Sequence, residues 1–220
     1  MILHLAAVMS ADDVAALRDA LADPALFDDG RRTAGWAAAA VKNNRQARPG
    51  GRARTLAHQV ERALQANEVF AAYARPKAFV RTQFSRYGEG MAYGAHVDDA
   101  LMGGQRTDLS FTLFLSDPQT YDGGDLVIET EAGDTRVKMA AGEAVVYPTG
   151  ALHRVEPVTA GERLAAVGWV RSFVRRADQR DVLFDLEIAA RGVHGREGKS
   201  DTFDRLAKAR ANLVRMWAED

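Results

Sequence analysis

The spacing of apolar residues divides the chain into three parts, of which the first is helical. Apolar positions recur three and four residues apart in residues 11–22 and 54–74, as on one face of an α-helix. Ser10, with Asp13 three residues later, is typical of a helix N-terminus. Residues 26–51 are rich in Gly, Arg and Asn and predict irregular structure. We therefore expect an N-terminal helical support region with two helices over residues 1–76.

At residue 77 the spacing changes to one typical of β-strands. Short runs of β-type residues alternate with segments rich in Gly, Pro and Asp, which predict turns. Many short strands joined by tight turns indicate a barrel or sandwich, so we expect a mainly β core over residues 77–176. The predicted strands cover residues 77–87, 106–117, 124–130, 134–140, 142–148 and 162–174.

Helical spacing returns in residues 177–192 and 200–219 and predicts a C-terminal helical extension over residues 177–220. Ser200 is the expected N-cap of the last helix. One side of this helix is apolar, and the stripe suits either packing on the β core or a homo-oligomer interface. The stripe consists of Phe203, Leu206, Leu213 and Met216.

Composition narrows the class of protein. Of the 220 residues, 47% are hydrophobic and 27% are charged, as in folded globular chains. A net charge of -1 and the absence of a long apolar run lead us to expect neither a nucleic acid nor a membrane as partner. No basic stretch precedes the apolar N-terminal residues, so no signal peptide is expected. The absence of cysteine excludes disulfides and zinc–thiolate sites and fits a cytoplasmic location.

His96 and Asp98 are two residues apart, so an extended chain would point both side chains to one face. His153 is the best candidate for a third ligand. It follows a tight turn at the start of a β-type run, and an antiparallel core can fold that run back beside His96. The remaining histidines are expected to be surface or satisfied residues: His4 at the terminus, His58 in a helix and His194 in a glycine-bearing loop.

Two histidines and one carboxylate form the facial triad of non-haem Fe(II) enzymes. Three metal positions stay open, one for O2 and two for a bidentate co-substrate such as 2-oxoglutarate. A structural zinc site would need a fourth ligand. The distal carboxylate of 2-oxoglutarate needs a cationic anchor, and Arg163, ten residues after His153 in an apolar run, is the candidate. The alternative places Arg163 at the start of a strand beside Glu162, with its head in water.

The order of His-x-Asp, a distal histidine and an arginine resembles that of the Fe(II)/2-oxoglutarate-dependent dioxygenases, in particular the prolyl 4-hydroxylase-like branch. Several segments are similar to the bacterial PKHD-type hydroxylases, and the resemblance covers nearly the whole chain. These segments are "VKNNRQ" (41–46), "RYGEGMAYGAHVDDA" (86–100), "RTDLSFTLFLSDPQTYDGGDLVI" (106–128), "VKMAAGEAVVYPTGALHRVEPVTAGERLAAVGWVRS" (137–172) and "RDVLFDLE" (180–187).

The resemblance implies a double-stranded β-helix, or jelly-roll, core with Fe(II) at one open end. It implies His96, Asp98 and His153 as iron ligands, Arg163 as the anchor of 2-oxoglutarate and Tyr87 as a further contact to this co-substrate. The implied reaction hydroxylates a substrate that the sequence does not identify and decarboxylates 2-oxoglutarate to succinate and CO2. O2 is the oxidant and L-ascorbate the expected reductant. Beyond the metal ligands, no catalytic side chain is expected.

Other residues of these segments have two interpretations each. Tyr93 and Trp169 match positions that line the pocket in the wider superfamily, or they are core packing. Asp99 departs from the family, in which a small residue often follows the aspartate ligand, and is expected to point away from the metal. Gly124 either lets backbone approach a pocket or only completes a hairpin turn.

The mouth of the pocket is expected to be basic, which would favour an acidic substrate or metabolite. Its expected cations are Arg81, Arg86 and Arg106.

Two other functions stay open on the residues alone. A non-catalytic metal-binding β-barrel, acting as an iron or oxygen sensor, explains the histidines and the aspartate but gives Arg163 no task. A β-rich interaction domain explains none of them and predicts no stoichiometric iron. The Arg163→Ala variant distinguishes the oxygenase from the metal-binding barrel, because an oxygenase should then lose 2-oxoglutarate and keep its metal.

Overall fold

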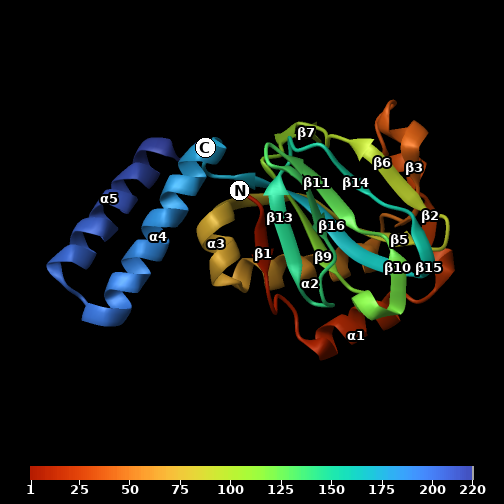
Figure 1. Cartoon of the computed structure of the whole chain (residues 1–220), viewed down its shortest axis with the longest axis horizontal. Coiled ribbons are helices and arrows are strands. Elements are labelled where there is room, and N and C mark those ends of the chain that lie inside the picture. The colour runs from red at the N-terminus through yellow and green to blue at the C-terminus, as the bar shows by residue number, and fades with distance from the viewer. Residues whose placement is uncertain (220) are drawn as a thin grey trace.

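Two antiparallel β-sheets form the body of the protein (Figure 1). The computed structural model describes residues 1–219. The larger sheet has the strand order β1 (Leu3–Leu5), β13 (Ala144–Pro148), β9 (Leu109–Phe114), β16 (Arg163–Ser172), β5 (Pro76–Tyr87), β4 (Arg45–Ala47) and β2 (Phe27–Asp29). The smaller sheet has the order β12 (Gly133–Val137), β11 (Leu126–Thr130), β14 (His153–Val155), β6 (Ala92–His96) and β3 (Lys42–Asn43). Two short pairs join β10 (Tyr121–Gly123) to β15 (Val158–Gly161), and β7 (Leu101–Met102) to β8 (Gln105–Arg106).

The two sheets face each other across an apolar layer. One hydrophobic cluster joins Phe114 and Tyr147 of the larger sheet to Ile128 and Val155 of the smaller sheet. Two packed antiparallel sheets with this connectivity are the predicted jelly-roll core, and they do not close into a barrel.

Strand β9 explains why the larger sheet is also covered on its outer face. Leu109 and Leu113 belong to the cluster that contains the helices, whereas Phe114 belongs to the layer between the sheets. Because neighbouring strand residues face opposite ways, a strand with all six residues buried needs a layer on each side.

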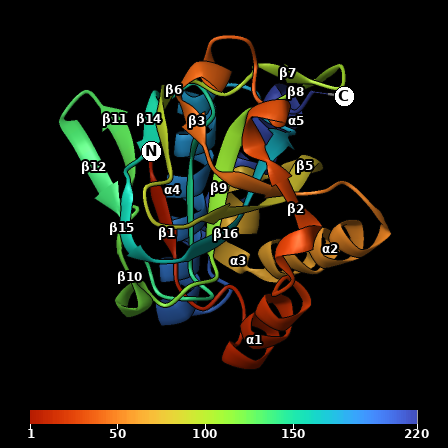
Figure 2. The same cartoon turned by 90° about the vertical axis from the view of Figure 1, so that its right-hand side faces the viewer.

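Helices α1 (Ala11–Ala20), α2 (Gly51–Ala66) and α3 (Glu68–Ala74) supply this outer layer (Figure 2). They bury Leu17, Val60 and Phe70 in the same cluster. The predicted N-cap of α1 is confirmed, since the Ser10 side chain accepts a hydrogen bond from the Asp13 amide at 3.2 Å. Four 3-10 turns complete the helical elements of the described residues: η1 (Pro24–Leu26), η2 (Gly30–Thr33), η3 (Ala38–Val41) and η4 (Pro118–Thr120).

The second predicted helix, over residues 54–74, is divided in the structure. Asn67 has an extended backbone (φ -74°, ψ 114°) and ends α2. Its side chain also begins α3, because Oδ1 accepts a hydrogen bond from the Phe70 amide at 3.0 Å. The apolar spacing continues across Asn67, which is why the spacing alone predicted one helix.

The first 76 residues are not only helical. They also contribute β1 to the edge beside β13, β4 and β2 to the edge beside β5, and β3 to the edge beside β6. The description of this region as helical support was therefore incomplete. These strands have two or three residues each, too few to show an alternating pattern. A division into separate domains at residues 76 and 176 stays a prediction.

The C-terminal extension is a hairpin of α4 (Ala177–Glu197) and α5 (Asp201–Trp217), which lies to one side of the sheets (Figure 1). Phe184 of α4 packs edge-on against Tyr73 of α3, with ring centroids 5.5 Å apart. No residue of α5 is buried. The predicted N-cap Ser200 accepts from the Phe203 amide at 3.3 Å. Within residues 1–219, no helix is long and apolar enough to cross a membrane.

Candidate metal centre and active-site cavity

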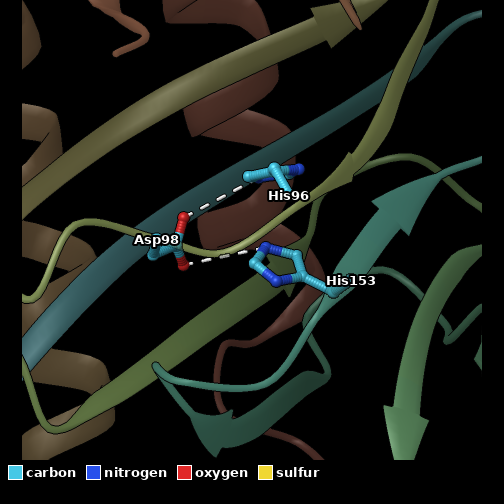
Figure 3. Close-up of side chains that lie close together, drawn as sticks. All are labelled: His96, Asp98 and His153. Atoms are coloured by element: carbon cyan, nitrogen blue, oxygen red, sulfur yellow. Dashed lines mark ion pairs between the residues drawn. The ribbon is translucent and has the colours of Figure 1, made fainter. Parts of the chain in front are cut away.

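The three predicted metal ligands meet where β6 ends and β14 begins (Figure 3). His96 and His153 are direct partners in the antiparallel pair of these strands, as predicted, and Asp98 follows in the loop after β6. Nε2 of His96 lies 3.8 Å from Oδ1 of Asp98, and Nε2 of His153 lies 3.7 Å from Oδ2. One candidate ligand atom from each residue can be chosen so that all lie within 4.8 Å of one another.

Both imidazoles are oriented by the backbone. Nδ1 of His96 lies 2.8 Å from the carbonyl oxygen of Gly94, and Nδ1 of His153 lies 3.0 Å from that of Ala151. A carbonyl oxygen can only accept, so each Nδ1 carries the proton and each Nε2 offers its lone pair toward Asp98. This is the tautomer that a metal ligand needs.

Electrostatics keep His96 neutral. Burial, and then the nearby His153, lower the pKa of His96 to about 4. Asp98 is held in place by the Ser110 hydroxyl, which donates to Oδ2 at 2.8 Å. A neutral imidazole beside an oriented carboxylate is the protonation state that binds a divalent ion.

The gap between these groups fits one metal ion. Distances of 3.7 and 3.8 Å between Nε2 atoms and carboxylate oxygens are too long for hydrogen bonds. Ligands at about 2.0 to 2.2 Å from a shared ion stand roughly 3 to 4 Å apart. Among residues 1–219, this is the one histidine and carboxylate cluster with such spacing.

A cavity of about 210 Å³ extends from the metal ligands between the two sheets. Alternate residues of β5 line it, from Tyr87 at its inner end to Arg81 at its exposed end. Strand β16 lies directly beside β5, and its Arg163 pairs with Tyr87 while Trp169 pairs with Arg81. The cavity therefore has a buried polar end and an open end.

Arg163 lies at the buried end, with 1% of its surface exposed. Its guanidinium carbon lies 5.3 Å from the ring centres of Tyr87 and Phe114. It makes no ion pair with an acidic side chain within residues 1–219, and its Nε has no hydrogen-bond partner. The interpretation that placed its head in water is wrong. A buried cation without a carboxylate calls for an anionic ligand.

Gly124 makes room for this arginine. Its φ is +67°, and a Cβ atom there would lie 3.1 Å from Cδ of Arg163 and 2.9 Å from Cγ2 of Val158. The close approach to a cavity residue is confirmed, whereas the hairpin turn is not, because β10 and β11 on either side of Gly124 belong to different sheets.

Two buried tyrosines line the cavity near Arg163. Burial raises the pKa of Tyr87 and raises that of Tyr147 well above its usual range, so both hydroxyls keep their protons. Tyr147 was not predicted, although its ring centre lies 5.2 Å from that of His153. Alternation along β13 puts it on the same face as Val145, so one polar atom in an apolar strand was the available signal.

Tyr93, Trp169 and Asp99 each had two interpretations, and the structure places all three at the cavity. Tyr93 stacks on His96 with ring centres 3.6 Å apart, and Trp169 is buried along the cavity wall. Asp99 is exposed, lines the cavity and lies outside the metal-ligand cluster.

Of the three arginines expected at the mouth, only Arg81 lines the cavity. Arg86 is buried and donates to the carbonyl oxygen of Leu21. Arg106 pairs with Asp108 at 2.7 Å and with Glu219 at 2.9 Å. For Arg86 and Arg106 the expectation was wrong, because local acidic or carbonyl partners hold them elsewhere. His194 was also misplaced, since it lies in α4 rather than in a loop.

Comparison with known proteins agrees with this geometry. Residues 82–171 match the model of the 2OG-Fe(II) oxygenase superfamily. A PKHD-type hydroxylase of Maricaulis maris is 53% identical over 220 residues, which cover all of both chains. One of Parvibaculum lavamentivorans is 50% identical, again over the full length of both.

Solved structures share the fold at lower identity. A prolyl-4-hydroxylase of Pseudomonas putida superposes with a TM-score of 0.54 and 24% identity, covering 78% of this chain and 92% of its own. A prolyl hydroxylase of Trichoplax adhaerens gives a TM-score of 0.56 at 12% identity, covering 83% and 86%. On its identity to full-length relatives, the chain belongs to the PKHD-type hydroxylases, within the 2OG-Fe(II) oxygenase superfamily.

Proposed function

We propose that His96, Asp98 and His153 bind the Fe(II) of this hydroxylase and that Arg163 binds its 2-oxoglutarate. Membership of the family makes the chain an Fe(II)- and 2-oxoglutarate-dependent dioxygenase. The observation that supports the residue assignment is the fully buried Arg163 in the same cavity as the three ligands. A sensor that binds only metal would have no use for this cation.

When bound, Fe(II), 2-oxoglutarate and O2 supply the oxidation, in which 2-oxoglutarate becomes succinate and CO2 and the substrate gains a hydroxyl group. The side chains of this protein bind, orient and exclude water. His96, Asp98 and His153 would hold the ion, and three protein ligands would leave it able to bind the co-substrate. Arg163 pairs with the distal carboxylate of the co-substrate, which directs the opposite end toward the ligands.

Tyr87 completes the proposed co-substrate site. It lies opposite Arg163 in the β5–β16 pair, and its buried hydroxyl keeps its proton for donation to a carboxylate. We assign no general base to the chain. L-Ascorbate as reductant and a cytoplasmic location stay predictions.

The fold alone does not identify the substrate. Solved structures with this architecture include prolyl hydroxylases and an epimerase of nogalamycin biosynthesis. A homo-oligomer that forms through α4 and α5 belongs to the proposal, because α5 has no buried residue and exposes Met216.

The test of the residue assignment is anaerobic titration of the Fe(II) protein with 2-oxoglutarate, followed by its metal-to-ligand charge-transfer absorption. We expect Arg163→Met to weaken 2-oxoglutarate binding about a hundredfold, since two charge-assisted hydrogen bonds are lost, and to keep Fe(II). Arg163→Lys should retain part of the affinity, because it keeps the charge but not the planar fork.

His96→Ala should lose Fe(II) itself. The exposed variant Lys208→Met on α5 serves as the control and should behave as wild type. Unchanged 2-oxoglutarate affinity in Arg163→Met would refute the anchor. Absence of succinate release by the wild type across cell-extract fractions would favour the sensor.

A further inference from the structure

A second polar wall lines the cavity on the side of β3 and β4. Lys42 is only 6% exposed, and Gln46 and Ser85 are also buried. Nζ of Lys42 donates to Oγ1 of Thr33 at 3.0 Å and to Oε1 of Gln46 at 2.9 Å. Nε2 of Gln46 then donates to the Ser85 hydroxyl at 3.1 Å. These bonds fix the amine in one place, at the cavity surface.

The Lys42 amine is a buried cation with spare capacity. It makes no ion pair with an acidic side chain within residues 1–219. An ammonium has three donors, and Thr33 and Gln46 take only two of them. Burial lowers its pKa to about 8, so the amine is still mostly protonated at neutral pH.

The amine lies beside the metal ligands. Nζ of Lys42 stands 4.8 Å from the ring centre of Tyr93, and Tyr93 stacks on His96. Strand register supports this placement, because Lys42 pairs with Tyr93 across β3 and β6. Arg163 pairs with Tyr87 on another strand pair of the larger sheet. The two cations therefore serve different parts of the cavity.

The charges of the cavity leave one positive charge uncompensated. Three of its side chains are cationic (Lys42, Arg81 and Arg163) and two are acidic (Asp98 and Asp99). Fe(II) and the dianion of 2-oxoglutarate cancel each other when both are bound. A monoanionic substrate would then neutralise the loaded cavity, whereas a cationic substrate would meet repulsion.

The opening of the cavity offers an apolar contact to the rest of such a substrate. Trp36 lines the cavity and is 94% exposed. A tryptophan this exposed has no partner of its own and provides a large flat surface for a bound molecule. Arg81 is also exposed and lines the same cavity.

We infer that the hydroxylation substrate carries a carboxylate, which Lys42 binds, while Trp36 covers the apolar part of the molecule. The inference rests on the proposed function, because it takes Arg163 and the metal ligands as occupied by co-substrate and ion. Lys42 is thus a specificity-determining residue of the proposed reaction.

The experiment measures binding, without turnover. The protein is saturated with Mn(II) and 2-oxoglutarate and titrated with three pairs of probes: N-acetylglycine, N-acetyl-L-proline and 3-phenylpropanoate, each against its primary amide. We expect at least one carboxylate to bind about tenfold more tightly than its amide, because one charged hydrogen bond distinguishes them. Binding should also quench tryptophan fluorescence, and Trp36→Ala should reduce the quenching.

Variants locate the cation. Lys42→Met should weaken the carboxylate about tenfold and leave the amide unchanged, and Lys42→Arg should recover part of the preference. The matched control is Lys208→Met, an exposed lysine of α5. Circular dichroism reports whether each variant folds. If Lys42→Met does not fold, the ratio of carboxylate affinity to amide affinity in the wild type still tests the inference.

Three results would overturn the inference: no probe binds, carboxylate and amide bind alike, or excess 2-oxoglutarate displaces the carboxylate. If the wild type did not bind 2-oxoglutarate at all, the proposed function would be contradicted instead. Failure of the inference and failure of the proposed function can therefore be told apart.

Discussion

Burial, and then the nearby His153, hold the imidazole of His96 neutral beside Asp98, and backbone carbonyl groups orient both histidine rings. Such a site is organised before the ion binds. In the metal-free protein, a proton can bind to the same imidazole nitrogen as the metal, at a cost in folding stability. Protonation of His96 would place a cation beside His153 in a dry environment. The same interactions that favour a metal therefore make the metal-free protein sensitive to acid.

We expect metal-free wild-type protein to lose stability as the pH falls from about 6.5 to about 4. The pKa of His96 is about 4 in the folded chain and near 6.5 in the unfolded chain, so only the unfolded state takes up the proton in this range. The loss is on the order of 2 to 3 kcal/mol. Urea unfolding at several pH values measures it, and His96→Gln should lack this part of the pH dependence. Parallel curves for the two proteins would show that His96 is not the source.

Gly124 links backbone conformation to the proposed anchor. Gly124→Ala should destabilise the fold by about 1 to 3 kcal/mol, through the positive φ and the contact with Cδ of Arg163. It should also weaken 2-oxoglutarate binding. Gly90→Ala is the matched control, since Gly90 has a φ of +74° with open space around its Cβ position. It should show the strain without the loss of affinity, and equal affinities in both variants would contradict the packing argument.

At the scale of elements, the caps of α3 and α5 distinguish a helix inside the core from one outside it. Asn67→Ala removes the cap of α3, whose Phe70 is fully buried, and should lower the global free energy of unfolding by about 1 kcal/mol. Ser200→Ala removes the equivalent bond in α5, which buries no residue. It should raise amide hydrogen exchange in α5 and leave the global unfolding transition nearly unchanged. Similar losses of global stability would mean that the hairpin unfolds with the core.

The sequence was informative where a pattern is local and repeats. It predicted the outer helices, six of the strands from Lys77 onward and the caps at Ser10 and Ser200, but not the short strands β7, β8, β10 and β15. It missed β3 because two residues cannot show an alternation. It found His96, Asp98, His153 and Arg163 through their order and chemistry, and the structure brings them to one cavity. It missed Lys42 and Tyr147, because their burial depends on contacts between segments far apart in the chain.

At the scale of the whole molecule, the sheets and the C-terminal hairpin have different roles. The sheets enclose the cavity, whereas α4 and α5 lie outside it and touch the body mainly through α4 and α3 (Figure 1). The predicted apolar stripe lies on α5, where Phe203 contacts His194 of α4 with ring centres 4.9 Å apart. Helix α4 packs on the body, and α5 is the surface that we assign to self-association.

We expect the wild type to form an oligomer in sedimentation velocity experiments, and Met216→Glu to weaken its association about tenfold or more. Met216 is 72% exposed, so the change should not disturb the monomer, and a buried charge opposes an apolar interface. Lys208→Glu, at an exposed position outside the predicted apolar stripe of α5, should associate as wild type does. A wild type that stays monomeric at all concentrations would remove α5 from this role.

The place of β3 at the edge of the smaller sheet has a consequence for how such enzymes diversify. Arg163 begins β16, which is flanked by β5 and β9, so a change there would disturb three strands at once. Lys42 belongs to a two-residue strand with a neighbour on one side only. Mutations in the segment that carries it can alter what is hydroxylated while the oxidising machinery is inherited intact. Mutation of this edge strand thus gives evolution a way to change the substrate while the fold is kept.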